Sequence, residues 1–194
     1  MWLWLLVPVA YLFGSLSSAV ITSRLMGLPD PRQEGSKNPG ATNVLRLGGK
    51  KAAIITLLGD MLKGLLPLVL AKALGAEQAL LAVVGLAAFI GHLYPVFLGF
   101  KGGKGVATAG GIFFGFSWPA GLLVMLTWIA VAYATKYSSL SALVAALLAP
   151  VYIGLLTKSP TLVLPALLMG GVLFWRHRDN IKRLRSGEES KIGS

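Results

Sequence analysis

Two short stretches, residues 35–46 and 99–105, place basic side chains among glycines. The first reads Gly-Ser-Lys-Asn-Pro-Gly-Ala-Thr-Asn-Val-Leu-Arg and the second Gly-Phe-Lys-Gly-Gly-Lys-Gly. Glycines let a backbone approach a ligand closely, and rows of N–H groups beside Lys or Arg suit the binding of phosphate. We therefore expect both stretches to bind a phosphorylated substrate.

The first stretch carries side chains that suit a phosphate ester. They offer hydroxyl, amide and guanidinium groups on Ser36, Asn38, Thr42, Asn43 and Arg46. Pro39 and Gly40 predict a turn, after which residues 41–47 could open a short helix. An ordinary capped turn, with Ser36 and Asn38 bonded to nearby backbone, is the simpler alternative. Such a turn does not require Arg46, so we favour a binding role.

The second stretch differs from a nucleotide-binding P-loop. That motif needs four residues between its glycines and a Ser or Thr after the lysine, whereas Gly105 follows Lys104 here. No predicted strand precedes the stretch, so the sequence does not indicate an ATPase. We expect a helix to begin directly after Gly105. Its free N–H groups and its dipole would favour an anion beside Lys104.

Two histidines are candidates for acid–base chemistry. His177 lies with Asn180 in a polar segment near the C-terminus, where it could orient a hydroxyl group or accept its proton. A solvated histidine without a chemical role is the alternative. For His92, in Gly-His-Leu-Tyr-Pro, we favour a structural role. We interpret Asp60 and Lys63, three residues apart in an apolar segment, as a structural ion pair.

The segments that carry these residues are predicted to be membrane helices. The 194-residue chain is 55% hydrophobic and only 13% charged, with a mean hydropathy of +0.73. A helix needs about 20 apolar residues to cross a bilayer. Apolar windows recur at residues 2–21, 52–71, 78–97, 106–117, 119–135, 140–155 and 162–175. We expect an all-α integral membrane protein with seven transmembrane helices in one domain, residues 1–194. The chain has no cysteine, which excludes disulfides and thiolate chemistry.

The basic residues predict the orientation of these helices. Of 18 Lys and Arg residues, six lie in 24–51 and six in 176–191. With seven crossings and the N-terminus outside, these twelve face the cytoplasm with Lys101, Lys104 and Lys136, and only Lys72 and Lys158 lie outside. Without a crossing at 106–117, nine would lie inside and eight outside. The positive-inside rule therefore favours seven crossings and a cytoplasmic C-terminus, although a re-entrant 106–117 segment is the alternative.

Seven crossings would gather the polar segments on one face. Residues 35–46, 99–105, 136–141 and 177–193 would all face the cytoplasm, where they could converge on one active site. We interpret six of the basic residues as orienting groups that contact anionic lipid headgroups: Arg24, Arg32, Lys50, Lys51, Arg183 and Arg185.

Three motifs resemble the bacterial acyl-phosphate-dependent glycerol-3-phosphate acyltransferases. They are residues 35–46, residues 91–108 (Gly-His-Leu-Tyr-Pro-Val-Phe-Leu-Gly-Phe-Lys-Gly-Gly-Lys-Gly-Val-Ala-Thr) and residues 177–184 (His-Arg-Asp-Asn-Ile-Lys-Arg-Leu). The resemblance covers essentially the whole chain. It implies an enzyme of the bacterial inner membrane that transfers a fatty acyl group from acyl phosphate to the 1-hydroxyl of glycerol 3-phosphate. The products would be lysophosphatidic acid and inorganic phosphate.

The motifs together define a candidate site. We expect catalytic roles for four polar residues, Ser36, Lys104, His177 and Asn180. We expect substrate binding by other residues of the motifs: Lys37, Asn38, Thr42, Asn43, Arg46, Lys101, Gly102, Gly103, Gly105 and Thr108. We expect no metal ion and no cofactor. The partners would be the two phosphorylated substrates and membrane lipids, not nucleic acid, and the protein would be a monomer.

The expected mechanism is direct attack of the glycerol hydroxyl on the acyl carbon. Acyl phosphate is an activated mixed anhydride, so the protein must chiefly hold the reactants together and stabilise negative charge. Many acyltransferases that use thioesters carry Asp five residues after His, but Phe97 and Lys182 stand at that spacing from the two histidines. A covalent intermediate on Ser36 would need a base nearby. A transporter of organic phosphates is the alternative function, although we find no internal repeat.

Overall fold

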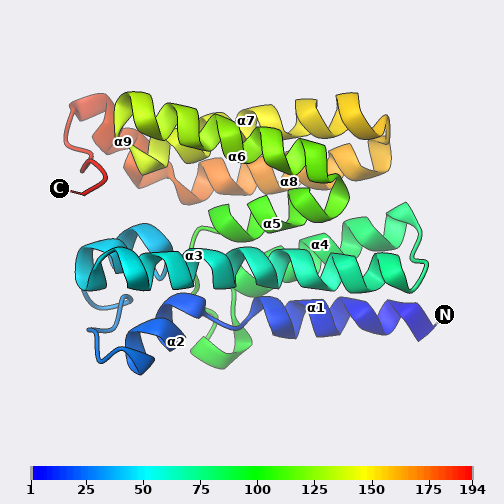
Figure 1. Ribbon diagram of the computed structural model, residues 1–194, viewed down its shortest axis with the longest axis horizontal. Helices are drawn as coiled ribbons and strands as arrows, with labels where there is room; N and C mark the ends of the chain where they lie inside the picture. The colour runs from blue at the N-terminus through cyan, green and yellow to red at the C-terminus, as the bar shows by residue number, and fades with distance from the viewer. Residues whose placement is uncertain (1, 194) are drawn as a thin grey trace.

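The structure, a computed structural model, describes residues 2–193, and over these residues the chain is almost entirely helical (Figure 1). In chain order the elements are the 3₁₀ helix η1 (Trp2–Leu5), α1 (Leu6–Gly14), α2 (Ser18–Leu25), α3 (Ala41–Ala73), α4 (Gln78–Leu93), the 3₁₀ helix η2 (Val96–Leu98), α5 (Val106–Phe116), α6 (Trp118–Thr135), α7 (Ser138–Thr157), α8 (Pro160–Arg176) and α9 (Arg178–Ser186). The all-α prediction is confirmed. The last four apolar windows coincide closely with α5, α6, α7 and α8.

Four helical segments of the described chain are long and apolar enough to cross a membrane. They are α3, α4 extended through η2 to Leu98, α6 and α7. A fifth candidate is the bent pair of Trp2–Gly14 and α2, which meet at 43°. The apolar helices α5 and α8 are shorter. With 11 residues, α5 extends only about 16 Å, roughly half of the hydrocarbon thickness of a bilayer.

The first apolar window, 2–21, is not the continuous helix that we expected, because the chain breaks between α1 and α2. The break leaves the carbonyl group of Leu16 outside a helix, and the Lys63 ammonium of α3 donates to it at 2.7 Å. Lys63 Nζ also lies 2.8 Å from Asp60 Oδ1, and both side chains are buried. The predicted Asp60–Lys63 ion pair is therefore confirmed, and it supplies a donor that the broken backbone needs.

Helix α3 also changes direction, at Gly49, whose backbone has φ 74° and ψ −172°. A positive φ of this kind is readily adopted by glycine. The part before Gly49 corresponds to the short helix predicted for residues 41–47, and the longer part after it contains the window 52–71.

Glycines bring the backbones of α3 and α5 into direct contact. A methyl group on Gly64 of α3 would lie 2.2 Å from the Thr108 carbonyl oxygen, and one on Gly111 of α5 would lie 2.0 Å from the Met61 carbonyl oxygen. Small residues of this kind let membrane helices approach closely. Most residues of α5 are buried.

The connections between helices gather at two ends of the molecule (Figure 1). Helix α9, the segment before α3 and the turn between α6 and α7 lie at one end, on the left of the view. The N-terminal end of the described chain and the turns α3–α4 and α7–α8 lie at the other. The polar segments 35–46, 136–141 and 177–193 therefore share one end of the fold.

Candidate active site

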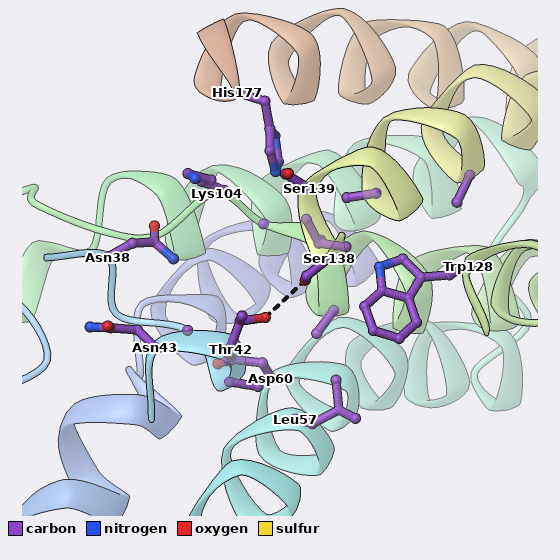
Figure 2. A pocket seen from close by; sticks show the side chains of 18 of the residues that line it. Asn38, Thr42, Asn43, Leu57, Asp60, Lys104, Trp128, Ser138, Ser139 and His177 are labelled. Carbon is purple, nitrogen blue, oxygen red and sulfur yellow. Dashed lines mark hydrogen bonds between the residues drawn. The ribbon is translucent and has the colours of Figure 1, made fainter. Parts of the chain in front are cut away.

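A cavity of about 570 Å³ opens among α3, α5, α6, α7 and the corner between α8 and α9. Figure 2 shows Lys104, Asn38 and Asn43 on one side of it and Trp128 and Leu57 on the other. Its polar wall includes Ser36, Asn38, Thr42, Asn43, Arg46, Lys104, Ser138, Ser139, His177, Asn180, Arg183 and Glu189. Its apolar wall includes Leu57, Met61, Phe114, Val124, Met125, Trp128, Ile129, Ala142 and Ala145. The cavity thus suits a ligand with a charged head and an apolar tail.

The segment before α3 is shaped by Asn43, which is almost fully buried. Its Nδ2 donates to the carbonyl oxygens of Pro31 (2.9 Å) and Glu34 (3.0 Å), and its Oδ1 accepts from the Ser36 backbone N–H (2.9 Å). A methyl group on Gly35 would lie only 2.3 Å from the same Oδ1. Asn43 lines the cavity, but its amide is engaged in holding the loop that carries Ser36.

The start of α3 is tied to the start of α7. Thr42 Oγ1 and Ser138 Oγ lie 2.9 Å apart, which forms the hydrogen bond dashed in Figure 2. This contact joins two helices that begin 97 residues apart in the sequence, at Ala41 and Ser138. It brings the second polar segment of the wall, Ser138 and Ser139, beside the first.

A chain of polar side chains starts at Lys104. Its Nζ donates to Asn180 Oδ1, Asn180 Nδ2 donates to Glu189 Oε1 (2.6 Å), and Arg183 Nε donates to Glu189 Oε2 (2.7 Å). Burial lowers the pKa of Lys104 to about 8, although the negative charge of Glu189 acts in the opposite direction. Burial alone would raise the pKa of Glu189, but the nearby hydroxyl of Ser139 and the hydrogen bonds from Asn180 and Arg183 hold it below its usual range. Near neutral pH this row of hydrogen-bonded side chains therefore contains a charged ammonium, on Lys104, and a charged carboxylate, on Glu189.

His177 is buried at the corner between α8 and α9. Its Nδ1 lies 2.8 Å from the Leu173 carbonyl oxygen, which can only accept a hydrogen bond, so Nδ1 carries the proton of the neutral ring. Nε2 is then left as an acceptor. Burial, together with the charge of Lys104, lowers the pKa of His177 to about 4. The ring is therefore neutral at pH 7.

The backbone N–H and carbonyl groups of Gly102 and Gly103, in the second stretch, are bonded to other parts of the protein. The N–H groups of Gly102 and Gly103 donate to the carbonyl oxygens of Leu93 (3.2 Å) and His92 (3.3 Å). Their own carbonyl oxygens accept from Arg176. Gly102 and Gly103 therefore do not offer the free N–H groups that we expected. They hold the loop, which then turns at Gly105 (φ 89°) into α5.

The beginning of α5 faces the cavity. Gly105, Val106 and Ala107 all line it. The first N–H groups of a helix have no partner within the helix, and together with the helix dipole they favour an anion. The predicted helix start after Gly105 is confirmed, and it lies beside Lys104.

Nine of the fourteen candidate residues line the cavity: Ser36, Asn38, Thr42, Asn43, Arg46, Lys104, Gly105, His177 and Asn180. Five others, all within the described chain, do not: Lys37, Lys101, Gly102, Gly103 and Thr108. Lys37 and Lys101 are exposed. Thr108 is fully buried, with its Oγ1 3.1 Å from His92 Nδ1.

Sequence reasoning missed several residues of the wall. Ser138 and Ser139 lie in the polar segment 136–141, which we expected to face the site, but neither serine was among the candidate residues. Arg183 lies in the motif of residues 177–184 but was interpreted only as an orienting residue, and Glu189 was not a candidate. Only the packing of the C-terminal segment brings Glu189 onto Asn180 and Arg183.

Comparison with known proteins gives consistent matches. The profile of the family described as glycerol-3-phosphate acyltransferase matches residues 4–187. A glycerol-3-phosphate acyltransferase of Methylococcus capsulatus is 63% identical over 98% of this chain and 96% of its own length. One of Thioalkalivibrio sulfidiphilus is 58% identical over 97% and 93%.

Two solved structures are also similar. The crystal structure of PlsY (YgiH), an integral membrane glycerol 3-phosphate acyltransferase, in its glycerol 3-phosphate form superposes with a TM-score of 0.93. It is 39% identical, and the match covers 100% of this chain and 96% of that one. Its lysophosphatidic acid form gives a TM-score of 0.91 at 37% identity, with the same coverage.

The charge of Lys104 predicts how anion binding depends on pH. A lysine with a pKa of about 8 is charged below that pH and loses its charge above it. The affinity for inorganic phosphate should therefore fall by up to about tenfold per pH unit above pH 8, over a range in which the phosphate itself stays doubly charged. Titration calorimetry in detergent would measure this. Lys104→Arg keeps the charge, so its affinity should not fall in this way, and an equal fall would place the titrating group elsewhere.

Proposed function

The chain belongs to the glycerol-3-phosphate acyltransferase family and is an integral membrane enzyme that forms lysophosphatidic acid, and we propose that its acyl donor is an acyl phosphate. The glycerol 1-hydroxyl would accept the acyl group, and inorganic phosphate would leave. The observation that carries this proposal is the two-sided cavity. Its cationic end suits phosphate groups, and its apolar end suits a fatty acyl chain.

The number of basic and polar groups supports a donor that itself carries phosphate. Lys104, Arg46 and Arg183 line the same cavity, and the start of α5 adds a further anion site. A single phosphate ester would not need all of these groups. A mixed anhydride also needs little activation, because phosphate is a good leaving group.

We propose direct attack with His177 as the proton acceptor. The glycerol oxygen would form a bond to the acyl carbon as the bond from that carbon to the phosphate oxygen breaks. Nε2 of His177 would take the hydroxyl proton, which then passes to the departing phosphate. Lys104, paired with Asn180, would stabilise the negative charge that develops. The negative charges of the bound phosphates offset Lys104, so they should raise the pKa of His177 from its low value in the empty site.

The donor is tested with purified protein in detergent. Glycerol 3-phosphate with a long-chain acyl phosphate should give lysophosphatidic acid and an equal amount of inorganic phosphate. An acyl-CoA of the same chain should react far more slowly, and an equal or faster rate would contradict the proposed donor. Turnover in detergent needs no second compartment, so it also distinguishes the enzyme from a transporter.

Two lysine variants test whether the reaction takes place in the cavity. Lys104→Ala should raise the reaction barrier by about 2–4 kcal/mol, comparable to the loss of an oxyanion donor. Lys51 is exposed and lies outside the cavity wall, so Lys51→Ala should leave turnover within a few-fold of the native rate. Similar losses in both variants would locate the reaction elsewhere.

Ser36 separates direct attack from a covalent route. In direct attack the acyl group stays on its phosphate until the acceptor arrives, so labelled inorganic phosphate should not exchange into acyl phosphate when glycerol 3-phosphate is absent. Ser36→Ala should lower turnover strongly and leave a residual rate. Exchange in the native enzyme that disappears in Ser36→Ala would instead establish an acyl-serine intermediate.

We also propose that the chain crosses the membrane seven times, with the polar end of the cavity on the cytoplasmic side. The distribution of Lys and Arg supports this orientation. So does the run of the helices from end to end, with the two ends of the described chain at opposite ends of the fold (Figure 1). The short α5 packs against α3, α4 and α6, so protein rather than lipid covers much of it.

Cysteine labelling tests the orientation, because the native chain contains no cysteine. Lys158→Cys, in the exposed turn between α7 and α8, should react with an impermeant thiol reagent added to intact cells. Ser186→Cys, exposed at the end of α9, should react only after the cells are opened. Labelling of both from outside would exclude the proposed topology.

A further inference from the structure

We propose that Arg176 is a positioning residue, whose guanidinium fixes the loop of residues 99–105 so that Lys104 and the start of α5 face the bound phosphate. This inference rests on the proposed function of the same site. Arg176 itself does not line the cavity. It is the last residue of α8 and immediately precedes His177.

The contact is made by one nitrogen of the guanidinium. Nη2 of Arg176 donates to the carbonyl oxygens of Gly102 (3.1 Å) and Gly103 (2.7 Å). The guanidinium carbon also lies 5.9 Å from the ring centres of Tyr94 and Trp175, which limits where the side chain can move. Hydrogen bonds from a charged donor are stronger than neutral ones, so Arg176 is well suited to hold a glycine-rich segment that has little stiffness of its own.

The opposite side of the loop rests on the end of α4. The N–H groups of Gly102 and Gly103 donate to Leu93 and His92. A methyl group on Gly102 would lie 2.0 Å from the His92 carbonyl oxygen, and one on Gly103 would lie 2.5 Å from His92 Nε2. The His92 ring is itself braced by Thr108, at 3.1 Å. The two glycines are therefore held between α4 and Arg176, with their N–H and carbonyl groups both bonded.

This arrangement sets the distance between two halves of the site. Lys104 follows directly after the held glycines, His177 follows directly after Arg176, and Asn180 lies four residues after Arg176. The hydrogen bonds from Arg176 to the two glycines therefore tie the Lys104 loop directly to the corner that carries His177. Without them, the loop that carries Lys104 would be held only from the α4 side, by the bonds of Gly102 and Gly103 to Leu93 and His92.

Steady-state kinetics of three variants tests the proposal. Arg176→Met keeps the length of the side chain but removes its donors. It should raise the KM for at least one phosphorylated substrate by about tenfold or more, while kcat at saturation changes much less, because bound phosphate restores the position of the loop. Arg176→Lys keeps a charged donor but loses the planar guanidinium that lies near the rings of Tyr94 and Trp175, so it should be intermediate. Arg178→Met is the matched control: Arg178 also stacks on Trp175, but it bonds only to the Trp175 carbonyl oxygen. It should keep native values.

Three results would overturn the proposal. A fall in kcat with both KM values unchanged would indicate a loss of folded enzyme only. Native kinetics in Arg176→Met would show that the loop needs no support. Fully native values in Arg176→Lys would show that the guanidinium is not required to fix the loop.

A binding measurement separates this proposal from that of the acyl donor. The affinity for inorganic phosphate, measured by calorimetry, should fall by about tenfold in Arg176→Met and stay native in Arg178→Met. This measurement requires no turnover, so it tests Arg176 even if the acyl donor is not an acyl phosphate. An unchanged phosphate affinity in Arg176→Met would contradict the positioning role.

Discussion

The positive charge of Lys104 is largely removed from water, and the rest of the site is organised around keeping that charge in place. A buried ammonium is costly unless polar partners surround it. Asn180 accepts its hydrogen bond, and Glu189 supplies the nearest negative charge, itself held by Arg183. Burial also makes the charge more effective, because a phosphate that reaches it meets little competing water.

The apolar body of the protein makes this arrangement possible. Glycines bring α3 and α5 into backbone contact, which buries α5 and points its first turn at the cavity. Polar groups inside the bundle satisfy the backbone where helices break, as Lys63 does for Leu16. A lipid environment offers no water for such groups, so each break needs a partner from the protein.

The two-sided cavity also explains why the enzyme is an integral membrane protein. Leu57 and Ile129 line its apolar side and are 42% and 48% exposed, so the apolar side of the cavity lies close to the outer surface of the helices. Helix α9, the segment before α3 and the α6–α7 turn carry much of the polar wall, and these elements lie together at one end of the fold (Figure 1). A product with a fatty chain and a phosphate head needs both environments within one molecule's length.

The sequence by itself determined the apolar helices after the first one, the helix start after Gly105, the Asp60–Lys63 pair and nine residues of the cavity wall. These follow from local properties: apolar windows, helix periodicity and the chemistry of residues within short motifs. Only the tertiary structure decided that Gly102 and Gly103 bond to His92, Leu93 and Arg176 rather than offering free N–H groups. It also decided that Glu189 joins the site and that the first helix breaks near Leu16. These outcomes depend on hydrogen bonds between segments far apart in the chain, and the spacing of residues in a sequence does not specify which distant donor meets which acceptor.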